Sequence, residues 1–446
     1  MNISRTKITA IVLGDVVLFY TSLFLTLLIR YRGEYISALY SLVYQHLQVF
    51  SFILLPWLLV FYLFELYREK NFKPNIATFT LFAQALATNV AVSIALFYFF
   101  LPVFGISPKT NLLIFVALFA VLDYVFRLGL GQIFVKRGMR NTILFIGDSP
   151  EMATTIEFIR QNPQVGYSVN KWIQKEDDGF DHLKEMIERE RINTLVIQSS
   201  IIKKSSTVKI VYQLLPMGVR IFDFVDFYEL AFKQIPLKEI EENWFIEHIR
   251  PMGPLYAFIR AVFEKVLAIV MLVILSPIIL LAAVAVKFTS RGPVIYRQER
   301  VGKNEQLFEI YKFRSMRVDA EKHGAQWSAP GDNRVTKVGK FLRATHIDEF
   351  PQLFNVLRGE VSFVGPRPER PEFVADLKKK VPYYEVRHLV QPGITGWAQI
   401  GYRYGSSVED AYRKLEFDIY YLKNMSFVLD ILIILKTIKT VFVNEQ

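Results

Sequence analysis

Four apolar runs, each long enough to cross a lipid bilayer, open this chain of 446 residues. They cover approximately residues 8–29, 47–66, 79–104 and 111–130. An α-helix rises about 1.5 Å per residue, so about 20 apolar residues cross the roughly 30 Å of hydrocarbon in a bilayer. Backbone amides find no water there, so a spanning segment of this kind must be helical. We therefore expect residues 1–135 to form a bundle of four transmembrane helices.

The basic residues of the connecting loops predict how this bundle is oriented. Cytoplasmic loops of membrane proteins carry an excess of Lys and Arg. One side of the bundle has Arg5, Lys7, Arg68, Lys70, Lys73, Lys136, Arg137 and Arg140. The other side has only Arg30, Arg32 and Lys109. The excess places both ends of the bundle in the cytoplasm.

A fifth apolar run, at about residues 262–286, has basic residues on both flanks. A straight span would carry one basic flank across the membrane, against the charge rule. Ser276 and Pro277 lie near the middle of the run, and a proline inside a helix removes one backbone hydrogen bond and clashes with the preceding turn. We therefore expect a broken, re-entrant helix that enters the cytoplasmic leaflet and returns, in preference to a kinked span.

Residues 138–242 show a different pattern, in which short strands alternate with helices. Strands are predicted at residues 142–146, 167–173, 194–197 and 219–222, and helices at 150–161, 183–191 and 206–215. This alternation predicts a parallel, Rossmann-like sheet, so the fold class is a membrane α-helical bundle plus α/β. After the first strand only Gly147 remains of the glycine-rich dinucleotide loop. We expect a degenerate nucleotide-binding domain that serves assembly or regulation.

The densest polar chemistry lies in residues 251–446, which we expect to form the catalytic domain. Two adjacent acids, Asp348 and Glu349, precede a short apolar helix, and Arg367 follows it in a rigid Gly-Pro-Arg-Pro loop. One acid can attack phosphorus or bind a metal ion while an arginine holds the phosphate oxygens. Thr345 and Asp348 also fit a helix-capping box, which would give the acid a purely structural role.

Other features of this region and of the composition narrow the class of substrate. Lys312 and Arg314, and further on Arg334, Lys337, Lys340 and Arg343, converge on the acid pair and predict a pocket for a polyanion. Because the chain has five apolar runs long enough to enter a membrane, its net charge of +11 favours lipid headgroups and phosphorylated substrates over nucleic acid as binding partners. The chain has no cysteine, which excludes disulfides, thiolate metal sites and thiol nucleophiles.

Two further segments complete the C-terminal region. The glycines of residues 391–401, QPGITGWAQIG, permit close approach of another backbone, and Trp397 would pack on lipid or protein. The apolar tail, residues 427–443, is interrupted by Asp430, Lys436 and Lys439, which favours an interfacial helix over another span.

Five motifs of the C-terminal region occur in the order found in one bacterial enzyme family. They are GPVIYRQERVG, YKFRSMR, ATHIDEFPQLFNVLRGEVSFVGPRP, PGITGWAQ and EFDIYYLKNMS. Through them the chain resembles the polyprenyl-phosphate sugar-phosphate transferases, also called monotopic phosphoglycosyl transferases. The N-terminal bundle and the α/β region are similar to the large, exopolysaccharide-initiating members of this family.

The resemblance implies a reaction and roles for individual residues. The reaction is transfer of a hexose 1-phosphate from a UDP-sugar to polyprenyl (undecaprenyl) phosphate with release of UMP. Glucose is preferred over galactose or a modified amino sugar. Asp348 matches the nucleophile that forms a covalent aspartyl-phosphosugar, and Glu349 matches the acid associated with Mg²⁺, so both are candidate metal ligands. The expected phosphate-binding set is Lys312, Arg314, Arg343, Arg367 and Asp418, and Ser276 and Pro277 match the break of the re-entrant helix.

The resemblance also implies a location and partners. We expect a multi-pass protein of the bacterial cytoplasmic membrane, in contact with membrane lipids, with its active site on the cytoplasmic face, as a homodimer. The chain departs from the family early in the re-entrant helix, where Arg260 and Glu264 replace the usual basic residue and aspartate. Such changes bear more on membrane packing than on chemistry.

Two readings from other classes compete with this one. The first is a membrane scaffold that recruits polysaccharide enzymes, with Asp348 only a helix cap. The second is a membrane-bound nucleotide-sugar dehydratase, which needs a Tyr-x-x-x-Lys pair and a glycine-rich loop. Tyr167 and Lys171 have that spacing but lie on a predicted strand, and the glycine-rich loop is missing.

Overall fold

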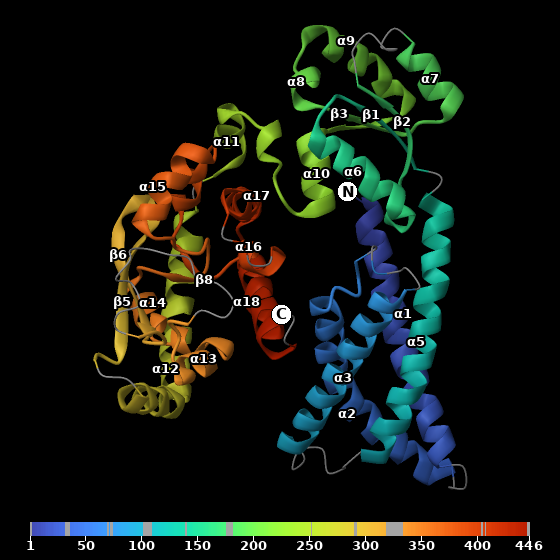
Figure 1. The fold of residues 1–446 in the computed structure, drawn as a ribbon. Helices are drawn as coiled ribbons and strands as arrows, with labels where there is room; N and C mark the ends of the chain where they lie inside the picture. Colours follow the sequence, from blue (N-terminus) through green and yellow to red (C-terminus); the bar gives the residue numbers. More distant parts are fainter. Residues whose placement is uncertain are drawn as a thin grey trace. The chain divides into compact units, whose positions relative to one another are not determined.

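A computed structural model gives the fold of the chain (Figure 1). It describes residues 2–31, 36–68, 71, 75–100, 109–138, 141–174, 182–250, 252–289, 292–317, 333–402, 405 and 407–443. The chain divides into two compact units, Met1–Phe224 and Val225–Gln446. The sequence predicts three domains, residues 1–135, 138–242 and 251–446. Their bounds stay predictions, because the two units do not divide the chain in the same way. In the structure, residues from Val225 onward pack with the second unit.

Five helices within the described residues are long and apolar enough to cross a membrane. Their spanning segments are Ile8–Arg30, Val43–Leu63, Ile76–Phe99, Thr110–Ile133 and Pro254–Thr289. The first four belong to helices α1 (Asn2–Arg30), α2 (Ile36–Leu63), α3 (Ile76–Phe99) and α5 (Lys109–Gly138) of the first unit. The fifth is α12 (Pro254–Thr289) in the second unit. Each of these five overlaps one of the five apolar runs seen in the sequence.

The interior of the α1, α2, α3 and α5 bundle is mainly aromatic, with one buried ion-pair cluster. Phe19, Trp57 and Phe115 are almost fully buried and meet edge to face. Arg127 binds Asp123 at 2.7 Å and Asp15 at 2.8 Å. Charges inside a membrane helix bundle are costly unless they are paired in this way.

The α/β region of the first unit contains the predicted parallel sheet. Its strands are β1 (Thr142–Ile146), β2 (Ser168–Ile173), β3 (Thr194–Ile197) and β4 (Arg220–Asp223), in the order β2-β1-β3-β4. Helices α6 (Pro150–Gln161), α7 (Leu183–Glu190), α8 (Ser199–Ile202) and α9 (Ser205–Leu214) connect the strands. Figure 1 shows α6 on one face of the sheet and α7 and α9 on the other.

The loop after β1 is where a nucleotide phosphate would bind in a Rossmann fold. In this chain the side chains of Gln198 and Trp172 contact that loop. A Cβ atom added at Gly147 would lie 2.5 Å from Cβ of Gln198. The Gln198 amide oxygen accepts a hydrogen bond from the Asp148 amide at 3.1 Å, and Trp172 Nε1 donates to the Gly147 carbonyl at 2.7 Å. Gln198 and Trp172 thus hold the backbone of this loop.

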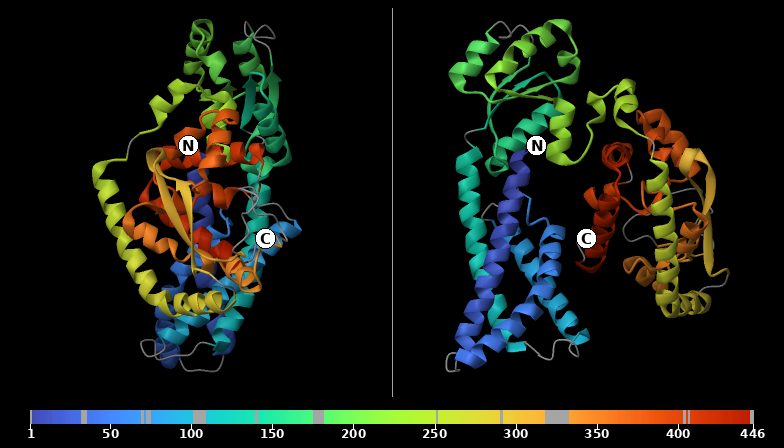
Figure 2. Two further views of the ribbon diagram at one scale, coloured as in Figure 1. Left: turned by 60° about the vertical axis from the view of Figure 1, so that its left-hand side comes forward. Right: turned by 180° about the vertical axis from the view of Figure 1, so that it is seen from behind.

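Helix α12 carries the most exposed apolar surface of the second unit, and its ribbon changes direction sharply part-way along (Figure 2). Pro277 lies inside the helix and cannot donate to the carbonyl of Val273, four residues earlier. The Ser276 hydroxyl donates to that carbonyl at 2.7 Å. The Ser-Pro pair thus bends the helix without leaving the freed carbonyl unpaired in an apolar environment.

The remainder of the second unit is built around two small sheets. Strands β5 (Ile295–Val301) and β6 (Leu307–Phe313) pair antiparallel, and β7 (Ser362–Val364) and β8 (Gly393–Thr395) pair parallel. The helices are α10 (Phe224–Phe232), α11 (Glu242–His248), α13 (Lys337–Ala344), α14 (Gln352–Arg358), α15 (Pro371–Lys380), α16 (Trp397–Gly401), α17 (Val408–Asn424) and α18 (Phe427–Val443). Short 3₁₀ segments at Ile347–Glu349 and Tyr384–Leu389 join them.

A buried polar network fixes α12 to these elements. Arg260 donates to Glu264 at 3.1 Å, to the Ser362 hydroxyl at 2.6 Å and to the Val364 carbonyl at 2.5 Å. Asp430 of α18 lies 3.4 Å from Arg260. Asp430 and Lys436, whose charges favour an interfacial α18 in the sequence, are both buried within the unit. α18 is not among the five span candidates.

Some sequence predictions fall outside the described residues. They concern the loop charges Arg32, Lys70, Lys73 and Arg140. The side chains of Arg5, Lys7, Lys109, Lys136 and Arg137 are outside the description as well.

Candidate active site

The acid pair lies on a single 3₁₀ turn between α13 and α14. His346 enters this turn with φ of 54°, and the Glu349 amide donates to the His346 carbonyl at 3.2 Å. The left-handed conformation of His346 reverses the chain after α13, which brings Asp348 and Glu349 back toward β6. The 3₁₀ turn ends at Glu349, and Phe350 and Pro351 lead into α14.

The alternative role for Asp348, as part of a helix-capping box, is wrong. Thr345 ends α13, and its hydroxyl donates backward to the Phe341 carbonyl at 2.9 Å. It is therefore not the N-cap of a helix that contains Asp348. The residue before α14 is Pro351, which makes no side-chain cap.

Glu349 is clamped by two cations from different elements. Its Oε1 atom accepts hydrogen bonds from Lys312 Nζ of β6 at 2.7 Å and from Arg367 Nη2 at 2.9 Å. Burial raises the pKa of the Glu349 carboxyl, but the two cations outweigh burial and hold that pKa well below its usual range. Burial lowers the pKa of Lys312, and Glu349 partly offsets that effect. Glu349 is thus a fixed, ionised carboxylate.

Asp348 differs from its neighbour. It is 7% exposed, and within the described part of the chain no group donates a hydrogen bond to its carboxylate. Burial raises the pKa of Asp348, the adjacent Glu349 adds to the rise, and Lys312 and Arg343 oppose it. The site therefore contains one carboxylate, Glu349, whose Oε1 atom is held by two cations, and one, Asp348, that accepts no hydrogen bond from the described residues.

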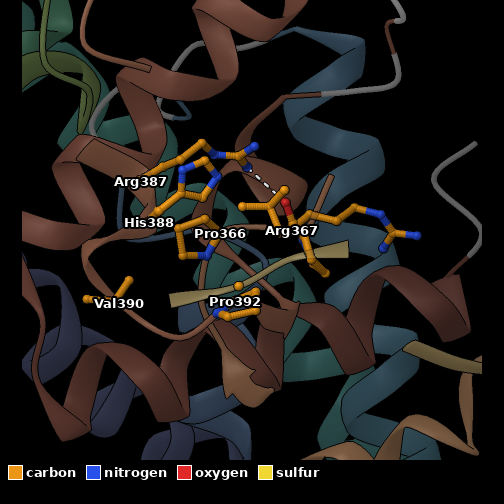
Figure 3. A pocket seen from close by; sticks show the side chains of 9 residues that line it. Pro366, Arg367, Arg387, His388, Val390 and Pro392 are labelled. Carbon is orange, nitrogen blue, oxygen red and sulfur yellow. Dashed lines mark hydrogen bonds between the residues drawn. The ribbon is translucent and has the colours of Figure 1, made fainter. Parts of the chain in front are cut away.

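The loop that carries Arg367 is held by its backbone. Three successive carbonyls accept hydrogen bonds from three different elements. The Gly393 amide of β8 donates to Pro366 at 2.9 Å, Arg387 to Arg367 at 3.0 Å, and Arg300 of β5 to Pro368 at 3.0 Å. Figure 3 shows the Arg387 contact, with the Arg367 side chain pointing away from Arg387. Arg387 therefore binds the backbone of Arg367, while the Arg367 guanidinium binds Glu349.

Glycines allow this loop to pack directly on β8, as the sequence predicts. A Cβ atom at Gly393 would lie 2.1 Å from the Gly365 amide nitrogen, and one at Gly396 would lie 2.3 Å from the Gly365 carbonyl oxygen. No side chain fits at either position without moving backbone. The distance between the Arg367 loop and β8 is thus set by backbone contact.

Asp418 does not contact the acid pair. It accepts from Arg387 Nε at 3.1 Å and Nη2 at 3.0 Å, and both side chains are buried. Burial raises the pKa of Asp418, and Arg387 opposes the rise. Asp418 is thus the buried counter-ion of Arg387, which in turn donates to the Arg367 carbonyl. Asp418 acts on the site through Arg387 and the Arg367 carbonyl.

The two other predicted phosphate-binding arginines, Arg343 and Arg314, differ in their surroundings. Arg343 donates from Nε to the Ser315 hydroxyl at 2.9 Å and is close enough to influence the pKa of Asp348. Arg314 is buried at the end of β6, and its amide donates to the Val294 carbonyl at 3.0 Å. Sequence reasoning missed Arg300 and Arg387. Arg300 lies within the motif GPVIYRQERVG, whereas Arg387 lies between motifs and carries no local signal.

The carboxylates of the site suit a metal ion only if another molecule completes its coordination. Within the described residues no three His, Asp or Glu side chains are grouped as metal ligands. Mg²⁺ is commonly held by one or two carboxylates together with substrate phosphates and water. Asp348 and Glu349 fit that arrangement.

Comparison with known proteins identifies the second unit most clearly. A family model described as bacterial sugar transferase matches residues 255–444. The UDP-glucose:undecaprenyl-phosphate glucose-1-phosphate transferase of Escherichia coli K12 is 28% identical over 424 residues, which are 91% of this chain and 90% of that protein. The protein of the same name from Klebsiella pneumoniae is 32% identical over 327 residues, 69% of each chain.

A third relative is similar over a shorter stretch. The UDP-N-acetylgalactosamine-undecaprenyl-phosphate N-acetylgalactosaminephosphotransferase of Aeromonas hydrophila is 48% identical over 189 residues. These residues are 42% of this chain and 45% of that protein, so the chain spans less than half of the length of this relative.

Proposed function

We propose that this chain, which belongs to the bacterial sugar transferase family, transfers a hexose 1-phosphate from a UDP-sugar to polyprenyl phosphate and releases UMP. The observation that carries the proposal is the contrast within the acid pair. Glu349 is fixed by Lys312 and Arg367, while the buried Asp348 beside it keeps its carboxylate oxygens available. A covalent nucleophile next to a cationic clamp is what a two-step transfer of a phosphoryl group needs.

In the first step an Asp348 oxygen attacks the phosphorus that bears the sugar. A bond forms between the carboxylate and phosphorus, and the bond to UMP breaks, so UMP leaves with the bonding electron pair. In the second step an oxygen of polyprenyl phosphate attacks the same phosphorus, and the bond to Asp348 breaks. The product is a polyprenyl diphosphate sugar. A phosphate oxygen is already anionic, so the second step requires no general base.

The cations of the site have separate tasks in this scheme. Lys312 and Arg367 hold Glu349 and would also bind oxygens of the diphosphate. Arg343, at the Asp348 side, would stabilise charge on the phosphorus under attack. Asp348 and Glu349 would hold Mg²⁺ together with the diphosphate, and the ion would supply charge neutralisation.

The proposal includes four transmembrane helices and a re-entrant α12, with the active site on the cytoplasmic face of the bacterial inner membrane. The bend at Ser276-Pro277 supports this arrangement, and so does the low burial of the α12 surface. The Arg260 network ties α12 to β7, directly before the loop that carries Arg367. A lipid-bound phosphate could thus meet a soluble nucleotide sugar at one site. A homodimer is a further part of the proposal.

The sugar is proposed to be glucose. Relatives named for glucose cover most of this chain, whereas a relative named for N-acetylgalactosamine covers 42% of it. Release of UMP from a panel of UDP-sugars, in the presence of polyprenyl phosphate, would identify the substrate.

The experiment that tests the reaction compares two isosteric substitutions. Asp348→Asn should abolish sugar-phosphate transfer, because the amide is a poor nucleophile. Asp376→Asn, at an exposed aspartate paired with Lys380, is the matched control and should leave transfer unchanged. Near-full transfer by Asp348→Asn would remove Asp348 as the nucleophile. No transfer by the wild-type protein with any UDP-sugar would remove the proposed reaction.

A further inference from the structure

The compact unit that holds the acid pair begins well before the family domain. The family match starts at residue 255, but the unit starts at Val225. Buried apolar residues of the segment 225–249 share one core with α15, α17 and the Tyr384–Leu389 turn. From the segment they are Val225, Ile235, Leu237, Ile240 and Trp244. The segment is therefore part of the catalytic core.

Helix α10 ends against Trp397, the first residue of α16. The Lys233 carbonyl, one residue beyond α10, accepts a hydrogen bond from Trp397 Nε1 at 3.0 Å. Trp397 is 7% exposed and stacks on Tyr420, with ring centroids 5.8 Å apart. Lys436 Nζ lies 5.5 Å from the indole ring. The sequence predicts that Trp397 packs on lipid or on protein. In the structure it packs on protein.

The position of α10 is fixed independently of Trp397. Glu229 of α10 accepts from Lys423 Nζ at 2.7 Å and from Asn424 Nδ2 at 2.8 Å, both at the end of α17. The Ile235 amide donates to the Glu416 carbonyl at 3.2 Å. The chain is thus attached to α17 on both sides of Lys233, at Glu229 within α10 and at Ile235 beyond it, so the Lys233 carbonyl is presented to the indole from a rigid support.

The backbone before Trp397 leads directly to the loop that carries Arg367. Gly396 lies against the Gly365 carbonyl, and the Gly365 amide donates to the Thr395 carbonyl at 2.9 Å. The Gly393 amide donates to Pro366, the residue before Arg367. A displacement of Trp397 would therefore also displace the Arg367 loop, because the two backbones are in direct contact.

We infer that the segment 225–249 is a positioning element of the active site, which acts through Trp397 and the β8 backbone to place Arg367 against Glu349. This inference rests on the proposed function of the acid pair. It adds that the catalytic unit of this chain extends about 30 residues upstream of the family domain. Trp397 is a positioning residue in this account, since it touches neither acid.

Trp397→Phe tests the inference, because it removes the hydrogen bond to Lys233 and keeps an aromatic ring. One such bond corresponds to a change of about two- to tenfold. We expect kcat/KM for UDP-sugar to fall by about that factor, with UMP release as the readout. Trp172→Phe is the matched control, because it removes an indole-to-carbonyl bond of 2.7 Å in the α/β region. It should leave kcat/KM unchanged.

A double-mutant cycle separates positioning of Arg367 from a general loss of stability. In an Arg367→Gln background there is no guanidinium to place, so Trp397→Phe should have no further effect on kcat/KM. Equal factors in both backgrounds, or full activity of Trp397→Phe, would overturn the inference and leave the proposed function standing. An inactive wild-type protein would instead overturn the proposed function. If Trp397→Phe does not fold, Glu229→Gln replaces it, because it weakens the attachment of α10 to α17, and the same cycle applies.

Discussion

Gly393→Ala is the substitution that the geometry of the site constrains most strongly. The added methyl would lie 2.1 Å from the Gly365 amide nitrogen and 2.4 Å from the Thr395 carbonyl oxygen. Ordinary contact begins near 3.4 Å, so the two backbones must separate by more than 1 Å. Overpacking of this kind costs about 1–3 kcal/mol of folding stability. The displaced loop carries Arg367, and a misplacement of about 1 Å in an active site can cost about a hundredfold in rate.

The assay measures UMP release and thermal unfolding for the same detergent-purified protein. Gly253→Ala is the matched control, since a Cβ atom at Gly253 meets no atom within 4 Å. We expect Gly393→Ala to lose about two orders of magnitude in kcat/KM, and Gly253→Ala to behave as wild type. Full activity of Gly393→Ala would show that backbone contact between β8 and the Arg367 loop does not set the geometry of the site.

Three further predictions concern the clamp, the buried ion pair and the membrane helix. Lys312→Met should lower kcat/KM about a hundredfold or more, as for loss of one preorganised cation, while Lys312→Arg should retain more activity. Because Lys312 helps to hold the pKa of Glu349 down, its removal should raise that pKa and move the acid limb of the pH–rate profile to higher pH; an unmoved limb would contradict this. Asp418→Asn leaves the buried Arg387 without its counter-charge and should cost about 3 kcal/mol or more in a thermal-unfolding measurement; wild-type stability would argue against the pair as the anchor of the loop. The chain has no cysteine, so single cysteines at Leu255 and Phe288, exposed near the two ends of α12, can be labelled selectively. A re-entrant helix predicts that an impermeant thiol reagent reaches both from the cytoplasmic side, and labelling of one from the outside would indicate a span.

Local patterns in the sequence predict most of the secondary structure. The bounds predicted for β1, α6 and β3 agree with the structure residue for residue, because short buried strands and a capped helix leave a local signal. Helix α12 extends at both ends beyond the predicted residues 262–286, since the basic residues Arg260 and Lys287 interrupt the apolar run but not the helix. The predicted bend at Pro277 follows from the missing amide alone.

Contacts between distant residues were less accessible to prediction. Lys312 and Arg367 could be predicted to lie near the acid pair, because each belongs to a motif whose charged residues suit phosphate binding. The roles of Arg387 and Arg300 depend on hydrogen bonds to the carbonyls of a loop, which any residue type can offer. The attachment of residues 225–249 to the catalytic unit depends on apolar packing, which sequence periodicity shows without naming the partner surface.

The most direct measurement of the central claim is a trapping experiment on the wild-type protein. Purified protein is incubated with UDP-sugar in the absence of polyprenyl phosphate, digested and analysed by mass spectrometry. The account predicts a peptide that carries a hexose phosphate on Asp348, formed together with an equal amount of UMP, and loss of this adduct when polyprenyl phosphate is added. Release of UMP that requires both substrates at once, with an unmodified Asp348 peptide, would contradict it.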